Sequence, residues 1–233
     1  MRFLVTVAGL LMVQIAAAKA YDKSAEIAGL TVHYKLILPK AYDETKAYPA
    51  VIAFPPGAQT MDMVLTTQER NWRGEAERRG YIVVIPAAPG GHLFFEEGAR
   101  VFPQFIEMLR RQYKIDGKLA IAGMSNGGLS AFHIAASYPQ YFSTLIGFPG
   151  YLPDATPARV DALSKMCIDM HAGALDSGWR EEMRMQFEWL RSKGYKISFT
   201  VEPGEGHVIG ALTGAGAARL FDEIEKGRQN CGE

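Results

Sequence analysis

Short apolar runs alternate along the chain with longer stretches in which apolar and polar residues recur at helical spacing. Most of the short runs hold about five consecutive apolar residues, a pattern typical of parallel strands buried on both faces. Residues 30–38 instead alternate apolar with polar and stop at Pro39, which predicts an antiparallel edge strand. The buried strands are predicted at residues 50–54, 81–85, 118–122, 142–148, 166–171 and 196–201.

The stretches between these runs predict amphipathic helices. Pro139, Gly194 and Gly227 each follow one of them, and proline or glycine there is typical of a helix end. Strands that alternate with helices predict an α/β fold, in which an open, twisted, mostly parallel sheet carries helices on both faces. In such a sheet the ligand site lies beyond the carboxyl ends of the strands. The helices are predicted at residues 68–79, 99–113, 126–138, 179–193 and 211–226.

Residues 1–20 have the three-part pattern of a secretory signal peptide. Arg2 precedes an apolar run at residues 3–15, and small residues follow at Ala18 and Ala20. The alternative, a membrane anchor, needs ~20 apolar residues to span a bilayer, and this run is shorter. We therefore predict cleavage after Ala20, a secreted or periplasmic location, and no stable membrane insertion afterwards. Residues 21–233 show no repeat or linker and are predicted to form one catalytic domain.

The overall charge is balanced, with 25 Lys and Arg residues against 25 Asp and Glu residues. This balance excludes the basic surface that drives nucleic-acid binding. Two cysteines are too few for a cysteine-rich zinc site, and the sequence has no H-E-x-x-H, paired C-x-x-C or P-loop motif. Residues 204–210 are similar to a dinucleotide-binding loop, but their glycine spacing differs and they lie at the end of the domain. The sequence therefore predicts no metal and no cofactor.

The most specific motif is Gly123-Met124-Ser125-Asn126-Gly127, a G-x-S-x-G sequence between a predicted strand and a predicted helix. This order is typical of a nucleophile elbow, a tight turn that lifts the serine hydroxyl above the sheet. Glycines on both sides suit places where the backbone passes too close for a Cβ atom. A glycine-rich turn with an incidental serine is the alternative, which the strand–helix context disfavours. We predict that Ser125 is a nucleophile and that the Asn126 N–H helps to bind an oxyanion.

A serine nucleophile needs a base, and His207 follows the last predicted strand, at the edge of the sheet where Ser125 lies. An acid that orients this base is expected between the two in the chain. Asp176, which follows the strand at residues 166–171, meets that expectation, so we predict a Ser-His-Asp triad. The remaining histidines are interpreted as structural or pocket-lining residues: His33, His92, His133 and His171.

These motifs resemble those of the α/β-hydrolase superfamily, especially its small secreted esterases of the polyhydroxybutyrate-depolymerase-like and feruloyl-esterase-like kind. The resemblance covers nearly all of residues 30–226 and rests on the segments around Ser125, Asp176 and His207. Residues 190–207 also resemble the prolyl-oligopeptidase-like and carboxylesterase branches. Membership of the superfamily implies the α/β-hydrolase fold, a Ser-His-Asp triad and no cofactor.

The same resemblance points to a second oxyanion donor. The His-Gly segment of those esterases maps onto residues 54–59, where Pro56 replaces the usual histidine. The backbone N–H of either Ala58 or Gln59 is therefore expected to act beside that of Asn126. Both alternatives remain open at the level of sequence.

Several ring-bearing side chains lie in predicted loops after the strands, where they would wall a pocket for the substrate. Trp179, close to Asp176 in the chain, is the strongest of these candidates. In an oxidising compartment, Cys167 and Cys231 are the right number of cysteines for one disulfide that ties the end of the chain to the sheet. The other pocket candidates are Tyr151, Phe94, Phe95 and His92.

The sequence thus predicts an exported serine esterase that cleaves a small-molecule or polymer-borne carboxylic ester through an acyl-enzyme. Residues 21–233 leave little room for a cap domain, so an open site is expected. A prolyl-oligopeptidase-like peptidase is the alternative enzyme. A hydrolase fold that binds a ligand without turnover is the alternative of another class, and an intact triad argues against it.

Overall fold

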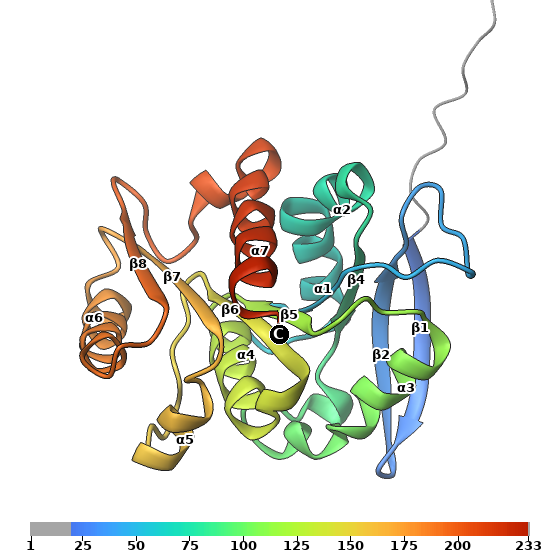
Figure 1. Cartoon of the computed structure of the whole chain (residues 1–233), viewed down its shortest axis with the longest axis horizontal. Coiled ribbons are helices and arrows are strands. Elements are labelled where there is room, and N and C mark those ends of the chain that lie inside the picture. The colour runs from blue at the N-terminus through green and yellow to red at the C-terminus, as the bar shows by residue number, and fades with distance from the viewer. Residues whose placement is uncertain (1–19, 233) are drawn as a thin grey trace, which may run out of the picture.

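The computed structural model describes residues 20–232, which form three layers around one sheet (Figure 1). The sheet has eight strands in the order β1-β2-β4-β3-β5-β6-β7-β8. β2 pairs antiparallel with β1 and with β4, and all other neighbours run parallel. The strands are β1 (Ala20–Ile27), β2 (Leu30–Ile37), β3 (Ala50–Phe54), β4 (Ile82–Pro86), β5 (Leu119–Gly123), β6 (Phe142–Gly147), β7 (Cys167–Gly173) and β8 (Ile197–Glu202).

The structure confirms the mostly parallel α/β sheet and corrects one strand. β2 is not an edge strand, because β1 pairs with it along its whole length, from Ala20 opposite Ile37 to Ile27 opposite Leu30. The sequence concealed β1 because its exposed middle is charged and polar and its first residue was assigned to the predicted signal peptide. The rest of that predicted peptide, residues 1–19, lies outside the described residues.

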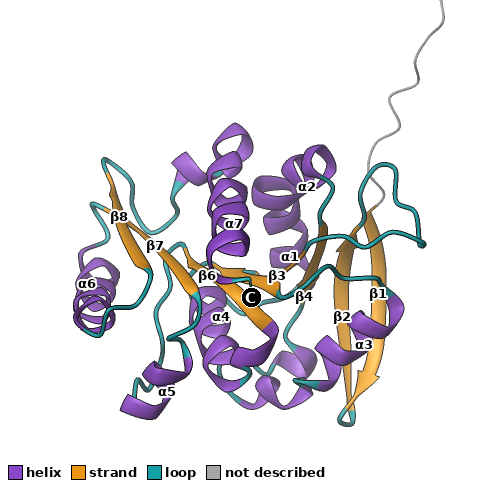
Figure 2. Ribbon diagram, in the orientation of Figure 1, coloured by secondary structure: helices purple, strands orange, loops and turns teal. Residues whose placement is uncertain are grey.

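Helices cover both faces of the sheet (Figure 2). One face carries α3, α4, α5 and α6, and the other carries α1, α2 and α7. The helices are α1 (Met61–Thr67), α2 (Arg73–Arg79), α3 (Gln104–Gln112), α4 (Asn126–Ser137), α5 (Pro157–Ala162), α6 (Ser177–Ser192) and α7 (Ala218–Cys231).

The uninterrupted apolar runs reflect a sheet that is buried on both sides. In β3, Ile52 and Phe54 pack into the core beneath α3, α4 and α6, whereas Val51 and Ala53 pack into the core beneath α1, α2 and α7. Successive side chains of a strand point to opposite faces, so a strand between two helical layers needs apolar residues at every position. This is why these strands were recognisable from sequence.

Several helix boundaries differ from the predicted ones because short turns of other types intervene. Residues 97–101 form a 3₁₀ helix, and α3 begins only after Pro103. Residues 210–212 and 214–217 are 3₁₀ turns, which delays the start of α7. The predicted end at Gly227 is wrong, because α7 continues through Gly227 to Cys231. The helix predicted at residues 68–79 starts earlier, as α1, and continues through a π-helical turn into α2. Helix α5 was not predicted.

The end of the chain is tied to the sheet by a disulfide between Cys167, the first residue of β7, and Cys231, the last residue of α7. The two Cα atoms are 5.8 Å apart, within the usual range for a disulfide. None of the helices formed by residues 20–232 combines the length and the apolar character that crossing a membrane requires.

Candidate active site

Ser125 occupies a sharp turn between β5 and α4. Its backbone has φ 58° and ψ −123°, a region that side-chain-bearing residues seldom occupy and that costs about 1–3 kcal/mol. The surroundings hold it there, because Ser125 N–H donates to the Pro149 carbonyl at 2.8 Å. A Cβ on Gly123 would lie 2.0 Å from the Gly127 carbonyl oxygen, and a Cβ on Gly127 would lie 2.2 Å from that of Phe54. Both glycines are therefore required by close backbone approach.

Ser125, His207 and Asp176 come together at the carboxyl ends of β5, β8 and β7. His207 Nε2 lies 2.8 Å from Ser125 Oγ, and His207 Nδ1 lies 2.7 Å from Asp176 Oδ2. With a carboxylate at Nδ1, that nitrogen carries the proton and donates to Asp176, which leaves Nε2 free to accept the serine proton. Hydrogen-bond contacts thus run without interruption from the Asp176 carboxylate through His207 to the Ser125 hydroxyl.

Asp176 stands at the start of α6, a position where aspartate usually caps the helix through its side chain. Here its side chain makes no capping hydrogen bond and instead accepts from His207. The Asp176 side chain is 15% exposed, whereas that of His207 is 39% exposed. The acid is therefore shielded while the imidazole faces an opening toward solvent.

The structure separates the two alternatives for the second oxyanion donor. The N–H of Gln59 donates to the Pro56 carbonyl at 3.1 Å, so it is already engaged. Within residues 20–232 no hydrogen bond engages the N–H of Ala58, which lies exposed in the same turn. The Asn126 side chain donates to the Gly57 carbonyl at 3.0 Å and thereby links this turn to the elbow. The geometry favours Ala58 as donor and argues against Gln59.

The Gln59 side chain instead links the turn to neighbouring elements. Gln59 is fully buried and its φ of 52° places it in the left-handed region. Its Nε2 donates to Ser130 Oγ at 2.8 Å, and its Oε1 accepts from the N–H of Phe94 at 3.2 Å. Gln59 therefore joins the turn of Ala58 to helix α4 and to the loop after β4.

Two of the five pocket candidates, Tyr151 and Trp179, belong to a row of ring contacts that reaches His207. The Trp179 ring packs against the His207 ring with centroids 5.1 Å apart, and the Tyr151 ring packs against the Trp179 ring at the same distance. The prediction for Phe94 is wrong, because it is fully buried in a cluster with Phe54 and Phe102.

The other two pocket candidates, Phe95 and His92, are neither fully buried nor part of the ring contacts beside His207. Phe95, next to Phe94, is half-buried. His92 is exposed and pairs with Glu97, with 3.2 Å between Nδ1 and Oε2.

The remaining histidines have separate environments. His33 lies on β2, and His133 lies on α4, where burial and then Arg159 lower its pKa to about 4. His171 is buried in β7 between two carboxylates. Within residues 20–232, no group of three or more His, Cys, Asp or Glu side chains is arranged to hold a metal ion.

Sequence reasoning missed the role of Glu205 in the histidine loop. Its two carboxylate oxygens accept from the N–H groups of Gly210 and Ala211 at 3.0 and 2.9 Å. These bonds close the chain into a loop around His207. The glycines that flank Glu205 in the sequence signalled a tight turn, but nothing in the sequence showed what its carboxylate would contact.

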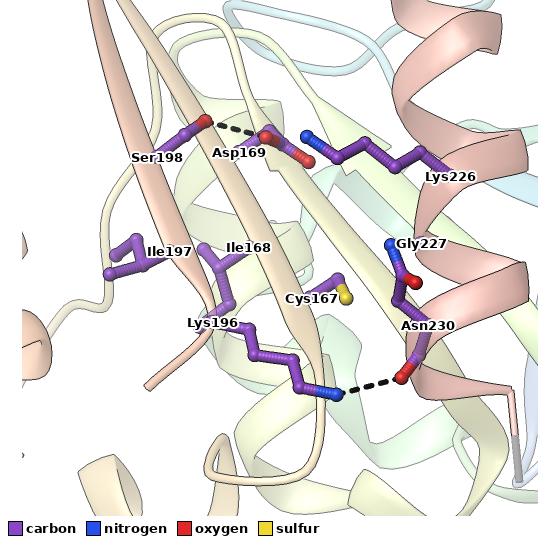
Figure 3. A pocket seen from close by; sticks show the side chains of 9 residues that line it. All are labelled: Cys167, Ile168, Asp169, Lys196, Ile197, Ser198, Lys226, Gly227 and Asn230. Carbon is purple, nitrogen blue, oxygen red and sulfur yellow. Dashed lines mark hydrogen bonds between the residues drawn. The ribbon is translucent and has the colours of Figure 1, made fainter. Parts of the chain in front are cut away.

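A separate hollow of 330 Å³ lies at the amino ends of β7 and β8, beside the end of α7 (Figure 3). Asp169, Ser198 and Lys226 are among the residues that line it, and Ser198 donates to Asp169 there. Asp176 and His207 follow the opposite ends of the same two strands. This hollow is therefore distinct from the candidate active site.

Comparison with known proteins gives matches to hydrolases. No family model matches the chain. A stretch of 128 residues is 27% identical to the dipeptidyl-peptidase 5 of Porphyromonas gingivalis. The match covers 49% of this chain but only 19% of the peptidase, so the similarity concerns a small part of a much longer protein.

Solved structures share the fold over most of the chain. The feruloyl esterase module of Clostridium thermocellum, in complex with sinapinate, has a TM-score of 0.71 and 15% identity, with 90% of this chain and 88% of that module covered. The S-formylglutathione hydrolase of Agrobacterium tumefaciens has a TM-score of 0.61 and 16% identity, with 91% and 95% covered. A thermostable esterase has a TM-score of 0.66 and 20% identity, with 81% and 55% covered. The chain therefore has the α/β-hydrolase fold.

Proposed function

We propose that this chain, which has the α/β-hydrolase fold, is a serine hydrolase that cleaves carboxylic esters. The observation that carries the proposal is the relay from Asp176 through His207 to Ser125, with contacts of 2.7 and 2.8 Å. A fold retained only for binding has no need to preserve a strained serine, a base at hydrogen-bond distance and a shielded acid together.

In the proposed reaction, Ser125 Oγ attacks the acyl carbonyl while His207 Nε2 removes its proton. Asp176 holds the imidazole in the tautomer that accepts at Nε2 and stabilises the imidazolium that forms. The bond to the alcohol then breaks, and His207 returns the proton to the leaving alkoxide. Water attacks the resulting acyl-enzyme by the same route and releases the acid.

The oxyanion of each tetrahedral intermediate would be bound by the backbone N–H groups of Asn126 and Ala58. Asn126 is the first residue of α4, so the positive end of the helix dipole adds to its N–H. Its side chain fixes the turn of Ala58 through Gly57. Loss of one such donor typically reduces kcat by ~10²–10³-fold.

An ester substrate is favoured over a peptide by the scale of the structural matches. The esterase module and the formylglutathione hydrolase are each covered for more than four-fifths of their length. A dipeptidyl aminopeptidase IV structure of Bacteroides ovatus has a similar TM-score of 0.67, but only 36% of that chain is covered, and the sequence match covers 19% of the dipeptidyl-peptidase 5. The described residues place only loops and the short helix α5 between β6 and β7, which leaves the triad accessible to a bulky ester. The peptidase match makes a peptide bond the second candidate substrate.

The decisive variant is Ser125→Ala. We expect it to remove hydrolysis of p-nitrophenyl butyrate, with a loss on the order of 10⁶-fold, while thermal unfolding stays close to that of the wild type. Fluorophosphonate labelling of the wild type, followed by peptide mass mapping, should locate the modified residue at Ser125. Hydrolysis by Ser125→Ala at the wild-type rate would show that the serine is not the nucleophile.

A matched pair of substrates separates the two enzyme candidates. We expect kcat/KM for p-nitrophenyl acetate and butyrate to exceed that for a proline p-nitroanilide by a wide margin. A clear preference for the anilide would replace the esterase by the peptidase. Extension of the ester panel to feruloyl and hydroxyalkanoate esters then identifies the acyl group.

Export is part of the proposal and rests on residues 1–20 and on the disulfide, which suits an oxidising compartment. Expression of the full chain in a bacterial host should yield a protein that begins at Tyr21. Intact-mass measurement of the exported fraction tests this, and a retained N-terminus in that fraction would contradict it.

A further inference from the structure

A buried histidine lies beneath the loops that carry the acid and the base. His171 of β7 has a side chain that is 1% exposed. Its Nδ1 is 3.0 Å from Glu202 Oε1, and its Nε2 is 3.0 Å from Glu223 Oε2. A carboxylate only accepts hydrogen bonds, and a neutral imidazole has one N–H. Both contacts are satisfied together only when His171 is an imidazolium.

The charges around His171 come from every element packed against it. Glu202 belongs to β8, Glu223 and Arg219 belong to α7, and Asp169 belongs to β7 itself. Arg219 donates to both oxygens of Glu202, at 2.7 and 3.1 Å. Lys226 of α7 is a further charged side chain nearby, and its charge opposes the rise that burial causes in the pKa of Asp169.

These groups set the protonation of the cluster. Burial alone would lower the pKa of His171, but Glu223 and then Glu202 outweigh it and raise the pKa above the ordinary 6.5. The hydrogen bond from Arg219, and then that from His171, hold the pKa of Glu202 below 4.5 against the effect of burial. These shifts favour an imidazolium and an ionised Glu202 at pH 6.5 in the quartet formed by His171, Glu202, Glu223 and Arg219.

The backbone of Glu202 connects this quartet to both loops of the triad. Its carbonyl accepts from the N–H of Ala174, in the loop of Asp176, at 2.9 Å, and from the N–H of Glu205, in the loop of His207, at 3.4 Å. The N–H of Leu175 donates to the Glu205 carbonyl at 2.9 Å. The two loops thus hold each other through a residue whose side chain is fixed by charge.

Because β8 lies at the edge of the sheet, its position depends on the contacts of Glu202 more than the position of a central strand would. β8 is the last strand of the sheet and pairs only with β7 within the described residues. A Cβ on Gly173, opposite Glu202, would lie 2.1 Å from the Gly206 carbonyl oxygen, so the strand ends meet at backbone contact. A small shift of β8 would therefore move His207 relative to Asp176.

We propose that His171, Glu202, Glu223 and Arg219 form a charged clamp whose members are positioning residues for Asp176 and His207, and that the clamp requires a protonated His171. This inference rests on the proposed function for its catalytic consequence. When His171 loses a proton at high pH, one of the two carboxylates loses its donor. Glu202 keeps its hydrogen bonds from Arg219, so the contact with Glu223, whose side chain is 21% exposed, is the one expected to break. The clamp then loosens, and Ser125 becomes less reactive.

The test compares the rate of fluorophosphonate labelling of Ser125 between pH 5 and 10 in the full chain. We expect the wild-type rate to fall at alkaline pH, when His171 deprotonates. In Glu223→Gln, the new amide N–H donates to a neutral His171 Nε2, so the clamp no longer needs the proton and the alkaline fall disappears. Glu225→Gln is the matched control, because Glu225 also lies on α7 but pairs with Arg79, and it should keep the wild-type profile.

Nuclear magnetic resonance of ¹⁵N-histidine-labelled protein tests the clamp without any reaction. Both His171 nitrogens should be protonated at pH 6.5, and the His207 Nδ1–H resonance should weaken in the wild type, but not in Glu223→Gln, as His171 titrates. A His171 that titrates below pH 6.5, or a folded Glu223→Gln with an unchanged alkaline fall, overturns the clamp. A wild type that the probe never labels contradicts the proposed hydrolase instead, and the resonance measurements then decide on the clamp alone.

Discussion

The two sides of the candidate site are held in place by different forces. Around β3 and β5, Ser125 is fixed by backbone atoms at contact distance and by apolar cores on both faces of the sheet. Around β7 and β8, Asp176 and His207 lie on loops linked to buried His171 and Glu202, which contact the more exposed Glu223 and Arg219. Central strands have neighbours on both sides, whereas β8 has one. Close backbone contact occurs on both sides, since Gly173 meets Gly206 at the edge, but only at the edge does the proposed clamp add charge to it.

The largest effect after loss of the nucleophile is expected at the acid. Asp176→Asn should lower kcat on the order of 10⁴-fold, the magnitude known for serine proteases, because the amide no longer enforces the productive tautomer of His207. The ester assay measures kcat, and unfolding curves verify that the fold persists. A loss in kcat of less than tenfold would show that Asp176 is not the orienting acid. The loops after β7 and β8 would then have no shared role in catalysis.

The next effect concerns the covalent link on the edge side. Replacement of both cysteines, Cys167→Ser with Cys231→Ser, should lower the free energy of unfolding by about 4 kcal/mol, given the sequence separation of 64. Denaturant titration measures it, with reductant-treated wild type as the comparison. A variant as stable as the wild type would mean that the clamp and the core hold α7 without the disulfide.

The pH dependence of stability distinguishes the two sides directly. The pKa of His171 is raised on folding, so its contribution is complete below pH 6.5 and is lost as the pH rises through its folded pKa. The difference in Tm between the wild type and His171→Gln should therefore be largest near pH 6 and shrink toward pH 9. Scanning calorimetry measures it, and a difference that grows with pH would contradict a charged His171.

The smallest effect is expected on the nucleophile side. Asn126→Ala removes the hydrogen bond to the Gly57 carbonyl but keeps the backbone N–H, so kcat should fall no more than about tenfold, the value of one hydrogen bond. No ionisable group takes part, so the fall should be the same at every pH where His207 is neutral. If the loss in kcat of Asn126→Ala depended on pH, an ionisable group would also support the nucleophile side, contrary to the comparison above.

Most of the sheet was predictable from sequence because a strand buried on both faces must be apolar at each position. β1 was not, since its exposed middle carries Asp22, Lys23 and Ser24 and it depends on β2 for its existence. The late starts of α3 and α7 escaped prediction because 3₁₀ turns at residues 97–101, 210–212 and 214–217 precede these helices with little or no break in the chain. Helix boundaries are set by local caps and by contacts that the pattern does not contain.

The sequence by itself predicted the strands from β2 to β8 and most of the helices between them. It also named Ser125, Asp176 and His207, because each stands in a short motif whose backbone demands are local. The tertiary structure alone decided which N–H remains available beside Asn126, since the engagement of Gln59 depends on Ser130 and Phe94, distant in the chain. It also removed Phe94 from the pocket and placed Trp179 against His207. The sequence left His171 as one of several minor histidines, because its two ring nitrogens meet Glu202 and Glu223 only where three separate elements come together.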